Sequence, residues 1–372
     1  MRFPEFSGEW KMCTIGELIT KVGSGVTPRG GEAVYKTEGH PFVRSQNVGL
    51  GNLLLDDIAF IDEETHLRQK NTELQFNDVL LNITGASIGR SALVDKQIVG
   101  GNVNQHVCII RTKENLVPSF ICSFLLSNYG QRQIDSFQAG GNRQGLNFEQ
   151  IKSIKITIPS KDEQIKIAKL LRAIDERIAT QNKIIDKLQS LIKGLRVCSM
   201  QRNGSNNVYL SEIAQIYQPQ TISSAELTED GFLVYGANGI IGKYKDYNHK
   251  TEQICITCRG NTCGMVNYTK PMSWITGNAM VINTDKYQDK VYKKYLYHYL
   301  SAYNFNSIIS GSGQPQIVRT PLEKLKITLP TISEQKQKAM ILDKVQDKIE
   351  INHNILNLYI LQKQYLLRQM FI

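Results

Sequence analysis

Residues 151–164 read IKSIKITIPSKDEQ and residues 322–335 read LEKLKITLPTISEQ, so one pattern occurs twice in this chain at an offset of 171 positions. Each copy is followed by a segment of roughly 35 residues with helical periodicity. Internal repeats indicate an architecture of repeated structural units. The sequence therefore predicts two similar halves, each made of a globular body followed by a long helix.

Both long helices have start signals. Ser160 with Glu163 in the first half, and Thr331 with Glu334 in the second, have the spacing of a capping box and follow a proline. In a capping box the two side chains bond free amides of the first helical turn. We therefore expect both helices to begin at these positions.

Apolar residues then recur at the first and fourth positions of a seven-residue repeat, a pattern typical of a helix that packs against another helix. In the first half these positions are Leu171, Ile174, Ile178, Gln181, Ile185, Leu188, Ile192 and Leu195, and in the second half they are Leu342, Val345, Ile349, Asn352, Leu356, Tyr359, Lys363 and Leu366. We expect the two helices to pair as an antiparallel coiled coil, because two halves joined through a compact second body bring their helices together head to tail more easily than in parallel.

One polar residue interrupts each apolar stripe near its middle, Gln181 in the first helix and Asn352 in the second. One interpretation is an ordinary imperfection of the stripe. The other is a pair of buried amides that costs stability and fixes the register of the helix pair. At 1.5 Å per residue each helix would span about 50 Å, so the pair would hold two domains a fixed distance apart.

The composition is that of an ordinary soluble protein with two domains. The chain has 372 residues, of which 41% are hydrophobic, enough for two bodies with separate cores in addition to the helices. It has no apolar run of about eighteen residues that would span a membrane, and its first residues lack the apolar centre of a signal peptide. We therefore expect a cytoplasmic protein without membrane contact.

The predicted fold class is mixed α/β, with two α+β domains that each precede a long helix. The expected boundaries follow the repeat: a first body over 1–150, a first repeat with its helix over 151–200, a second body over 201–321, and a second repeat with its helix over 322–372.

The net charge of +10 is compatible with a polyanionic partner. The basic excess is unevenly distributed, however. Residues 1–150 carry slightly more acidic than basic side chains, whereas 151–198 carry about twice as many basic as acidic ones. Because a charged helix face is usually just solvated, charge by itself leaves nucleic-acid binding and simple solvation equally open.

Three cysteines lie close together near His249 and have the look of a zinc site, but no second pair of ligands follows at metal spacing. The internal repeat favours an apolar role, because an offset of 175 aligns the cysteines with large aliphatic residues of the first half. The aligned pairs are Cys255 with Leu80, Cys258 with Ile83, and Cys263 with Ile88. We therefore predict no metal site, and cysteines that pack as small hydrophobic residues.

Catalytic and cofactor signatures are missing. The stretch 236–243 resembles a phosphate-binding loop, but its outer glycines are too far apart and Tyr244 replaces the hydroxyl residue that binds magnesium. A glycine pair at Gly23 and Gly25 is followed by Pro28 where a dinucleotide fingerprint needs glycine. No two prolines are adjacent, so the Asn/Asp-Pro-Pro-aromatic motif of amino-methyltransferases is absent. We expect no catalytic residues and no cofactor bound by this chain.

Each body contains a predicted strand, glycine-rich turn and second strand, over 78–94 in the first half and 251–268 in the second. An apolar strand and an amphipathic helix follow, with the helices expected around 117–136 and 289–308.

A loop with glycine and glutamine then precedes each repeat, at 140–147 and 311–317. Amide side chains can bond a base edge in the major groove, and glycine lets the backbone approach phosphates. The alternative is a structural turn that closes the domain. The repeat offset also shrinks from 195 near residue 15 to 171 at the helices, so the bodies have diverged while the helices match.

The chain resembles the specificity subunit of a type I restriction-modification system, and it does so along its whole length. The motifs that carry the resemblance are Arg2–Trp10 with Ile15–Leu18, Pro41–Val48, Tyr235–Gly242, Gly311–Ile317, and the two Pro-x3-Glu-Gln helix starts. One departure is the loop Gly141–Leu146, which lacks the proline usual after its glutamine.

The resemblance implies two target recognition domains that read the two halves of a split DNA site, separated by an unread spacer whose length the helices set. It implies binding without catalysis. Two modification subunits, which hold S-adenosylmethionine and methylate adenine, would dock on the helical regions. Restriction subunits with ATP-driven translocase and Mg-dependent nuclease activity would join them.

For contacts with DNA we expect basic side chains to hold the backbone, and amide or guanidinium groups of the loops to read bases. The candidates are Arg29, Arg44, Arg90, Arg143 and Gln144 in the first body and Lys243, Arg259, Asn261, Gln314 and Arg319 in the second.

Three alternatives stay open. One is a specificity subunit of a related but differently built restriction-modification enzyme. Another is a coiled-coil scaffold that joins protein partners and has bodies that do not bind DNA. The third is a self-sufficient methyltransferase or nuclease, which the missing motifs argue against.

Overall fold

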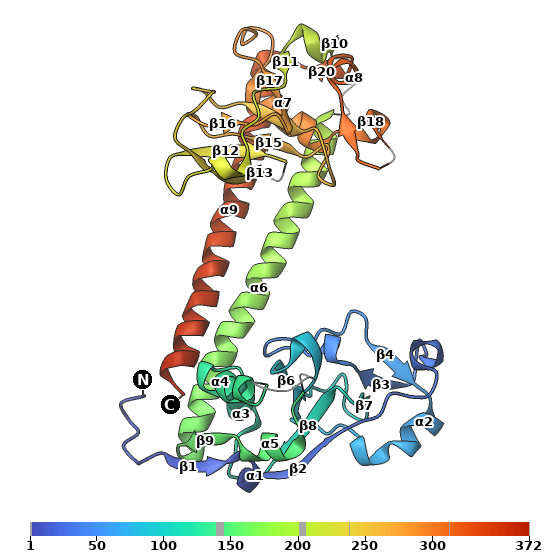
Figure 1. The fold of residues 1–372 in the computed structure, drawn as a ribbon, viewed down its shortest axis with the longest axis vertical. Helices are drawn as coiled ribbons and strands as arrows, with labels where there is room; N and C mark the ends of the chain where they lie inside the picture. The colour runs from blue at the N-terminus through green and yellow to red at the C-terminus, as the bar shows by residue number, and fades with distance from the viewer. Residues whose placement is uncertain (1, 139–144, 201–205, 238, 312, 372) are drawn as a thin grey trace. The chain divides into compact units, whose positions relative to one another are not determined.

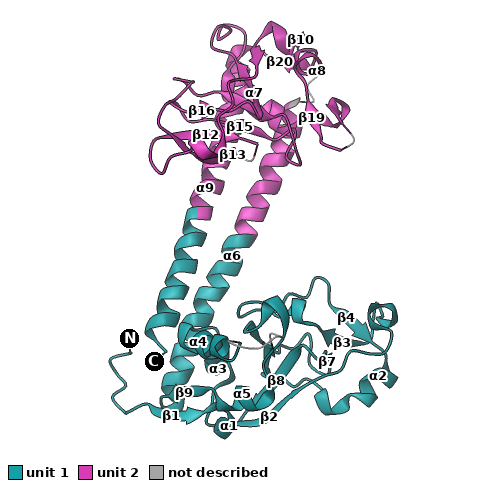
Figure 2. Cartoon of the chain, in the orientation of Figure 1, with its two compact units in different colours: residues 1–182, 354–372 teal, residues 183–353 magenta. Residues whose placement is uncertain are grey.

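The computed structural model describes all residues except 1, 139–144, 201–205, 238, 312 and 372. The chain divides into two compact units, one formed by residues 1–182 with 354–372 and the other by residues 183–353 (Figure 2). Both long helices contribute a segment to each unit. The helices and strands are those of a mixed α/β protein (Figure 1).

A four-stranded antiparallel sheet in the order β2-β8-β5-β6 forms the centre of the first unit. Its strands are β2 (Ile19–Ser24), β8 (Val107–Thr112), β5 (Val79–Asn82) and β6 (Ser91–Leu93). All four residues of β5 are buried, as expected for a central strand with apolar residues on both faces. Strands β5 and β6 flank the glycine-rich turn, which confirms the strand, turn and strand predicted for 78–94.

Two smaller sheets complete the strands of this unit. A three-stranded sheet in the order β4-β3-β7 contains β3 (His40–Val43), β4 (Ala59–Ile61) and β7 (Asn102–Val103), with β3 and β7 parallel. Strand β1 (Lys11–Thr14) pairs antiparallel with β9 (Lys155–Ile158), the strand that ends at the first long helix.

The helix expected around 117–136 is two helices. Helix α3 (Pro118–Leu125) ends before Ser127, whose hydroxyl accepts a hydrogen bond from the Gly130 amide and so begins α4 (Asn128–Ser136). The prediction of one continuous helix was wrong because the amphipathic pattern continues across a capping serine. The other helices of the first unit are α1 (Ile15–Leu18), α2 (Glu63–Arg68) and α5 (Phe148–Ser153).

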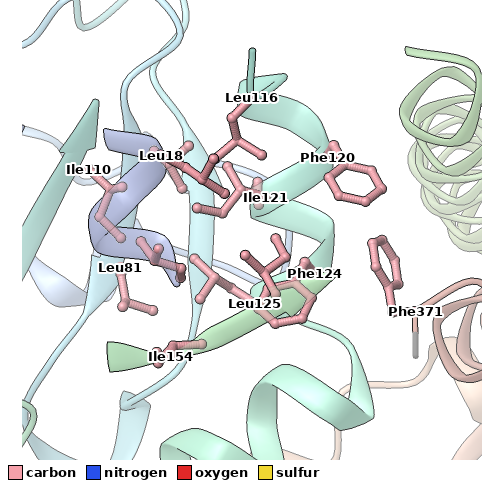
Figure 3. Close-up of a cluster of buried hydrophobic side chains, with 14 of the residues drawn as sticks. Leu18, Leu81, Ile110, Leu116, Phe120, Ile121, Phe124, Leu125, Ile154 and Phe371 are labelled. Atoms are coloured by element: carbon pink, nitrogen blue, oxygen red, sulfur yellow. The ribbon is translucent and has the colours of Figure 1, made fainter. Parts of the chain in front are cut away.

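The core of the first unit includes the last residues of the chain. Phe371 is 5% exposed, and its ring centroid lies 5.2 Å from that of Phe120 and 6.0 Å from that of Phe124, both on α3 (Figure 3). Leu366 and Leu367 belong to the same buried cluster. Burial of these side chains ties the end of the second long helix to the first body.

The second unit repeats the topology of the first. Its four-stranded sheet has the order β11-β17-β14-β15, its three-stranded sheet the order β13-β12-β16, and β10 pairs with β20. The strands are β10 (Asn206–Tyr209), β11 (Gln215–Tyr217), β12 (Phe232–Gly236), β13 (Gly239–Tyr244), β14 (Ile254–Thr257), β15 (Val266–Tyr268), β16 (Trp274–Ile275), β17 (Ala279–Asn283) and β20 (Lys326–Leu329). The matching strand orders confirm the two similar bodies predicted from the repeat.

Among described residues, a short hairpin of β18 (Ile309–Ser310) and β19 (Gln316–Ile317) is found in the second unit and has no counterpart in the first. Helix α7 (Lys293–Ala302) covers less of the chain than the predicted 289–308, because a short 3-10 turn follows it. Helix α8 (Arg319–Glu323) leads into β20. The 3-10 turns of the chain are η1 (Gly31–Val34), η2 (Ser45–Asn47), η3 (Lys70–Thr72), η4 (Gly85–Ser87), η5 (Leu210–Glu212), η6 (Ser224–Glu226) and η7 (Phe305–Ser307).

The long helices are α6 (Lys161–Met200) and α9 (Ile332–Gln369), slightly longer than expected. Thr331 and Glu334 form the predicted capping box, with bonds of 3.1 and 3.4 Å to each other's amides. In the first half the Ser160 hydroxyl caps the Glu163 amide at 3.4 Å, while both carboxylate oxygens of Glu163 accept bonds of 2.8 Å from Arg2.

Most of the repeat positions on the long helices are buried or half-buried. In the second unit Ile192, Leu342 and Ile349 form one buried cluster, whereas the neighbouring apolar residue Leu191 is 49% exposed. Contacts between the helix segments run in opposite directions in both units. In the first, Asp175 and Arg177 of α6 contact Lys363 and Tyr359 of α9, and in the second, Arg196 and Ser199 contact Gln346 and Lys338.

The glutamine of each Pro-x3-Glu-Gln motif joins the start of a long helix to its body. The Gln164 amide group donates to the carbonyls of Pro159 and Asn115, both at 3.1 Å, and its oxygen accepts a 2.9 Å bond from the Val117 amide. Gln335 makes the same three bonds, to the carbonyls of Pro330 (2.9 Å) and Lys290 (3.1 Å) and from the Tyr292 amide (2.8 Å). Both side chains are 1% exposed. The repeated motif therefore encodes a common attachment of helix to body.

The cysteines of the second body pack as predicted. Cys255 and Cys258 are buried in hydrophobic clusters, and burial raises the pKa of the Cys255 thiol to about 12. Among the residues that the structure describes, no group of three histidine, cysteine or acidic side chains is placed to hold a metal ion. No helix in the described part of the chain is long and apolar enough to cross a membrane.

Candidate nucleic-acid interface

In the second unit the glycine-rich turn and the glycine-glutamine loop lie side by side. The Gly260 amide donates to the Pro315 carbonyl and the Ile317 amide donates to the Cys258 carbonyl, both at 3.0 Å. Arg259 forms a β-bridge with Gln316. These bonds bring the exposed residues Arg259, Asn261 and Gln314 together, although the last lies more than fifty positions along the chain from the first two.

The turn of the β12-β13 hairpin joins the same surface. The hydroxyls of Thr257 and Thr262 both donate to the Ala237 carbonyl, at 2.8 and 2.6 Å. The adjoining strand β13 exposes Ile240 and Ile241 at 53% and 41%. The surface therefore combines a cation, amides and two apolar side chains, which suits contact with phosphates, base edges and the thymine methyl group.

The other two candidates of the second body already have partners. Lys243 lies 3.3 Å from a carboxylate oxygen of Asp230, and Arg319 donates a 2.7 Å bond to Glu323 four residues later. All but Glu323 of these four side chains are more than a third exposed, so these ion pairs are weak and water or phosphate can replace them.

In the first unit the equivalent loops also meet. Thr84 forms a β-bridge with Gly145, and the Leu146 amide donates a 2.8 Å bond to the Ile83 carbonyl. Arg90 is exposed at the end of the glycine-rich turn. The candidates Arg143 and Gln144 lie outside the described residues.

A chain of hydrogen bonds joins the glycine-rich turn of the first unit to the loop after β2. Thr84 Oγ1 lies 2.5 Å from Nδ1 of His106, and Nε2 of His106 lies 3.1 Å from the amide nitrogen of Gln105. The Gln105 oxygen in turn accepts a 2.9 Å bond from the Thr27 amide and another from the Thr27 hydroxyl. Because an amide NH2 only donates, His106 Nε2 is the acceptor, and Nδ1 carries the proton that Thr84 accepts.

This arrangement fixes which edge Gln105 presents. Its oxygen is occupied by Thr27, so the exposed side chain has one remaining amide hydrogen to offer. Such a donor can bond one major-groove acceptor, such as guanine O6 or N7, adenine N7 or thymine O4, and it does not make the two-bond contact with adenine that a free glutamine makes. The sequence reasoning missed Gln105, His106 and Thr27. The polar run Asn-Gln-His directly after a buried strand was the signal that could have found them.

Arg29 and Arg44 have different surroundings. Arg29 is exposed. The Arg44 guanidinium donates a 2.6 Å bond to the Asp57 carbonyl, approaches Glu32 at 3.4 Å, and lies 5.4 Å from the centre of the Tyr35 ring. Its side chain is only 13% exposed, and a contact with DNA would require release of these partners. Burial raises the pKa of the Tyr35 hydroxyl.

The sequence model for the type I restriction modification DNA specificity domain matches residues 7–190 and 203–358. Among curated proteins, the chain is 23% identical to the putative type I restriction enzyme MjaX specificity subunit of Methanocaldococcus jannaschii, over 93% of this chain and 89% of that protein. It is 32% identical to the EcoprrI specificity subunit of Escherichia coli over a shorter region, 36% of this chain and 34% of that protein.

Two solved structures share the fold. The S subunit of a type I restriction-modification system from M. genitalium aligns with a TM-score of 0.67 at 16% identity, over 100% of this chain and 97% of that one. A chain from a study of complex assembly and conformational transition of the type I R-M system aligns with a TM-score of 0.58 at 15% identity, over 98% of this chain and 97% of that one.

Proposed function

Because the chain belongs to the family of type I restriction modification DNA specificity domains, with one match in each half, we propose that it recognises a DNA target in two parts. It is a specificity subunit of a type I restriction-modification system. In the proposal the first recognition domain covers residues 1–150 and the second covers residues 201–321. The two repeats with their helices, 151–200 and 322–372, connect them.

The observation that carries this proposal is a duplicated scaffold with unlike surfaces. The four-stranded sheets have the same strand order in both units, and equivalent glutamines, Gln164 and Gln335, attach each body to its helix. The exposed loops differ: the second unit presents Arg259 and Asn261, whereas the first presents Gln105 within a chain of hydrogen bonds from Thr84 to Thr27. Two domains that recognise different DNA sequences on a common scaffold require similar cores with different exposed loops.

In the proposed mechanism the basic side chains Arg29, Arg90, Lys243 and Arg319 hold phosphates and fix the position of the DNA. Arg259 reads bases in one half-site, because a guanidinium fits the two acceptors of guanine. The remaining candidates, Arg44, Arg143, Gln144, Asn261 and Gln314, stay predictions of contact.

We also propose that α6 and α9 pair along their length as an antiparallel coiled coil and set the distance between the two half-sites. The opposite direction of the helix contacts within each unit supports this pairing. Gln181 is 7% exposed, and Asn352 donates a 2.6 Å bond to the Lys348 carbonyl of its own helix. A direct contact between Gln181 and Asn352 as a register pair is part of the proposal, and a disulfide formed between cysteines at these positions would test it.

The proposal assigns no catalysis and no cofactor to this chain. S-adenosylmethionine, ATP and magnesium would belong to two modification subunits and to restriction subunits that dock on the helical regions, in the cytoplasm.

The most direct experiment is to map methylated adenines across the host genome with and without this gene. We expect one split motif to disappear with the gene. Arg259→Ala should relax recognition in one half of that motif, and Arg90→Ala should weaken the other half. Arg68→Ala, on an exposed face of α2, is the matched control.

The alternatives predict other outcomes. A scaffold that does not bind DNA would leave the methylation pattern unchanged when the gene is removed. Equal loss in both halves of the motif after Arg259→Ala would contradict independent reading by the two units. A motif without a spacer would indicate a differently built restriction-modification enzyme.

A further inference from the structure

Gln164 and Gln335 attach both bodies to the long helices in the same way, and each unit has a second attachment that differs between them. These second attachments are partly buried polar clusters that connect a body with both long helices. Their residues are not shared by the two halves of the repeat, so they distinguish one body from the other.

The cluster of the first unit is centred on Lys363 of α9. Its ammonium group lies 2.6 Å from a carboxylate oxygen of Asp175 on α6, and it donates a 3.3 Å bond to the Leu50 carbonyl of the body. The Lys363 side chain is 16% exposed. Gly51 has a φ of +96°, and a Cβ at this position would lie 3.3 Å from the Lys363 nitrogen. The loop therefore approaches the lysine closely through its backbone.

The cluster of the second unit is centred on His298 of α7, which is 1% exposed. Its Nε2 lies 2.9 Å from Asp343 of α9, and its Nδ1 accepts a 3.2 Å bond from Arg196 of α6. Lys294 lies 2.9 Å from the other oxygen of Asp343. One body helix is thus bonded to both long helices through a neutral imidazole between a cation and an anion.

The residues of the second unit that are equivalent to Asp175 and Lys363 are uncharged. At the helix offset of 171, Asp175 corresponds to Gln346 and Lys363 corresponds to Ile192. The second unit therefore lacks both charges of the Lys363 cluster.

The reverse comparison gives the same result. Asp343 corresponds to Arg172, which has the opposite charge, and Arg196 corresponds to Leu367, which lies in the core of the first unit. The first unit therefore lacks the charges of the His298 cluster.

The body helices differ at the matching position too. Val117 and Tyr292 make the same bond, to Gln164 and to Gln335 respectively, so they are equivalent positions at an offset of 175. At this offset the residue equivalent to His298 is Ser123. Ser123 donates to the Ser119 carbonyl one turn earlier and lines a pocket of about 580 Å³. A serine at this position does not reach both long helices.

We propose that the two clusters are body-specific docking keys, which fix the orientation of each recognition domain on the helices and thereby restrict the spacer length that the DNA target may have. This inference rests on the proposed function. Each added base pair moves a half-site by about 3.4 Å and turns it by about a tenth of a helical turn, so a small reorientation of one body changes the preferred spacer. Partly buried, hydrogen-bonded charges favour one geometry, because a displaced charge loses its partner and water replaces that partner only in part.

The first test uses the complete specificity subunit with its modification subunits. Lys363→Met and Gly51→Ala disturb the first key, and Asp343→Asn disturbs the second. Arg68→Met is the control, because its bond to Glu64 is an exposed pair on one helix of the body. Methylation is measured on duplexes that carry both half-sites separated by every spacer within about two base pairs of the natural length.

We expect the wild-type and control subunits to methylate one spacer length. The key variants should methylate the neighbouring spacers on the order of tenfold more than wild type does, with the half-site sequences unchanged. An unchanged spacer profile, or lost sequence discrimination at an unchanged spacer, would overturn the proposal. If Lys363→Met fails to fold, the spacer profile of Gly51→Ala tests the first key instead. If the wild-type subunit directs no split motif, the proposed function fails and this inference fails with it.

A second test is independent of DNA. Spin labels at positions 96 and 180, both exposed in the first unit, report the distance between body and helix after Cys198→Ser removes the exposed native thiol. Lys363→Met should broaden the distance distribution, and Arg68→Met should leave it unchanged. A distribution of the same width in both variants would refute the key even if the protein reads DNA.

Discussion

Replacing Gln164 by leucine should loosen the attachment of the first long helix to its body. The side chain makes three hydrogen bonds to backbone groups of two separate segments, and it is 1% exposed. Leucine has a similar volume and makes none of these bonds. The substitution therefore leaves one amide and two carbonyls without their partner while the packing is nearly preserved.

The magnitude follows from the burial of the three bonds. The bond to Pro159 is fully buried, whereas those to Asn115 and Val117 are partly buried and their backbone groups can recover some hydration. With about 2 kcal/mol for the first group and about 1 kcal/mol or less for each of the others, the loss is about 3 kcal/mol. In a unit of roughly 200 residues this corresponds to a fall in melting temperature of about 6–12 °C.

Because the chain contains two units, a single global unfolding curve would mix their transitions. Hydrogen-deuterium exchange resolved by peptide measures each unit separately. Gln164→Leu should increase exchange around residues 115–125 and leave the strands of the second unit protected. Gln335→Leu should increase exchange around residues 290–300 and leave the strands of the first unit protected. Gln337→Leu, at an exposed position of α9, is the control.

Unchanged exchange around residues 115–125 in Gln164→Leu would refute the role assigned to the common glutamine. Equal loss of protection in both units would show that the attachment is not local, and would contradict the reasoning from bond geometry.

Three further outcomes are expected. Phe371→Ala should cost about 3 kcal/mol, because it removes a buried ring from the core of the first unit, and unchanged exchange of α3 would contradict this. Burial lowers the pKa of His298 below 6.5, so the unfolded chain binds more protons below that pH and stability falls as pH falls. Burial lowers the pKa of His249 as well, so it contributes to the same loss of stability at low pH. In urea unfolding at about pH 7.5 and about pH 5.5, His298→Gln should lose less stability on acidification than wild type, but still some. An equal loss in wild type and variant would refute the role of His298. Gln105→Ala should lower base discrimination at one position of one half-site without changing the salt dependence of binding, because it removes a base donor and no phosphate contact. A changed salt slope would argue against that role.

Much of the architecture could be predicted from the chain because its signals are local. The capping pair Thr331 and Glu334, the seven-residue periodicity and the repeated glutamine motif all act within a few residues of one helix. The apolar role of Cys255 followed from alignment of the two halves. The prediction of one helix over 117–136 was wrong because a single serine cap interrupts a pattern that periodicity does not distinguish from a continuous helix.

The candidate interface was only partly predictable. The glycine-rich turn and the glutamine loop were identified as separate segments, and the β-bridge between Arg259 and Gln316 shows that they form one surface. Gln105 was missed because its importance depends on its bond to Thr27, nearly eighty positions earlier. Arg44 looked like a free cation in sequence, whereas its guanidinium is bonded inside its own body.

The sequence by itself determined the number of halves, the type of fold and the positions of the long helices, because repeats, caps and periodicity are properties of neighbouring residues. Tertiary structure decided which charged residues are enclosed and which are presented. Lys363 occupies an apolar position of the helix repeat and looks misplaced until Asp175 and the Leu50 carbonyl surround it. The physical reason is that the free energy of a charge depends on the atoms packed around it, and the fold brings those atoms from distant parts of the chain.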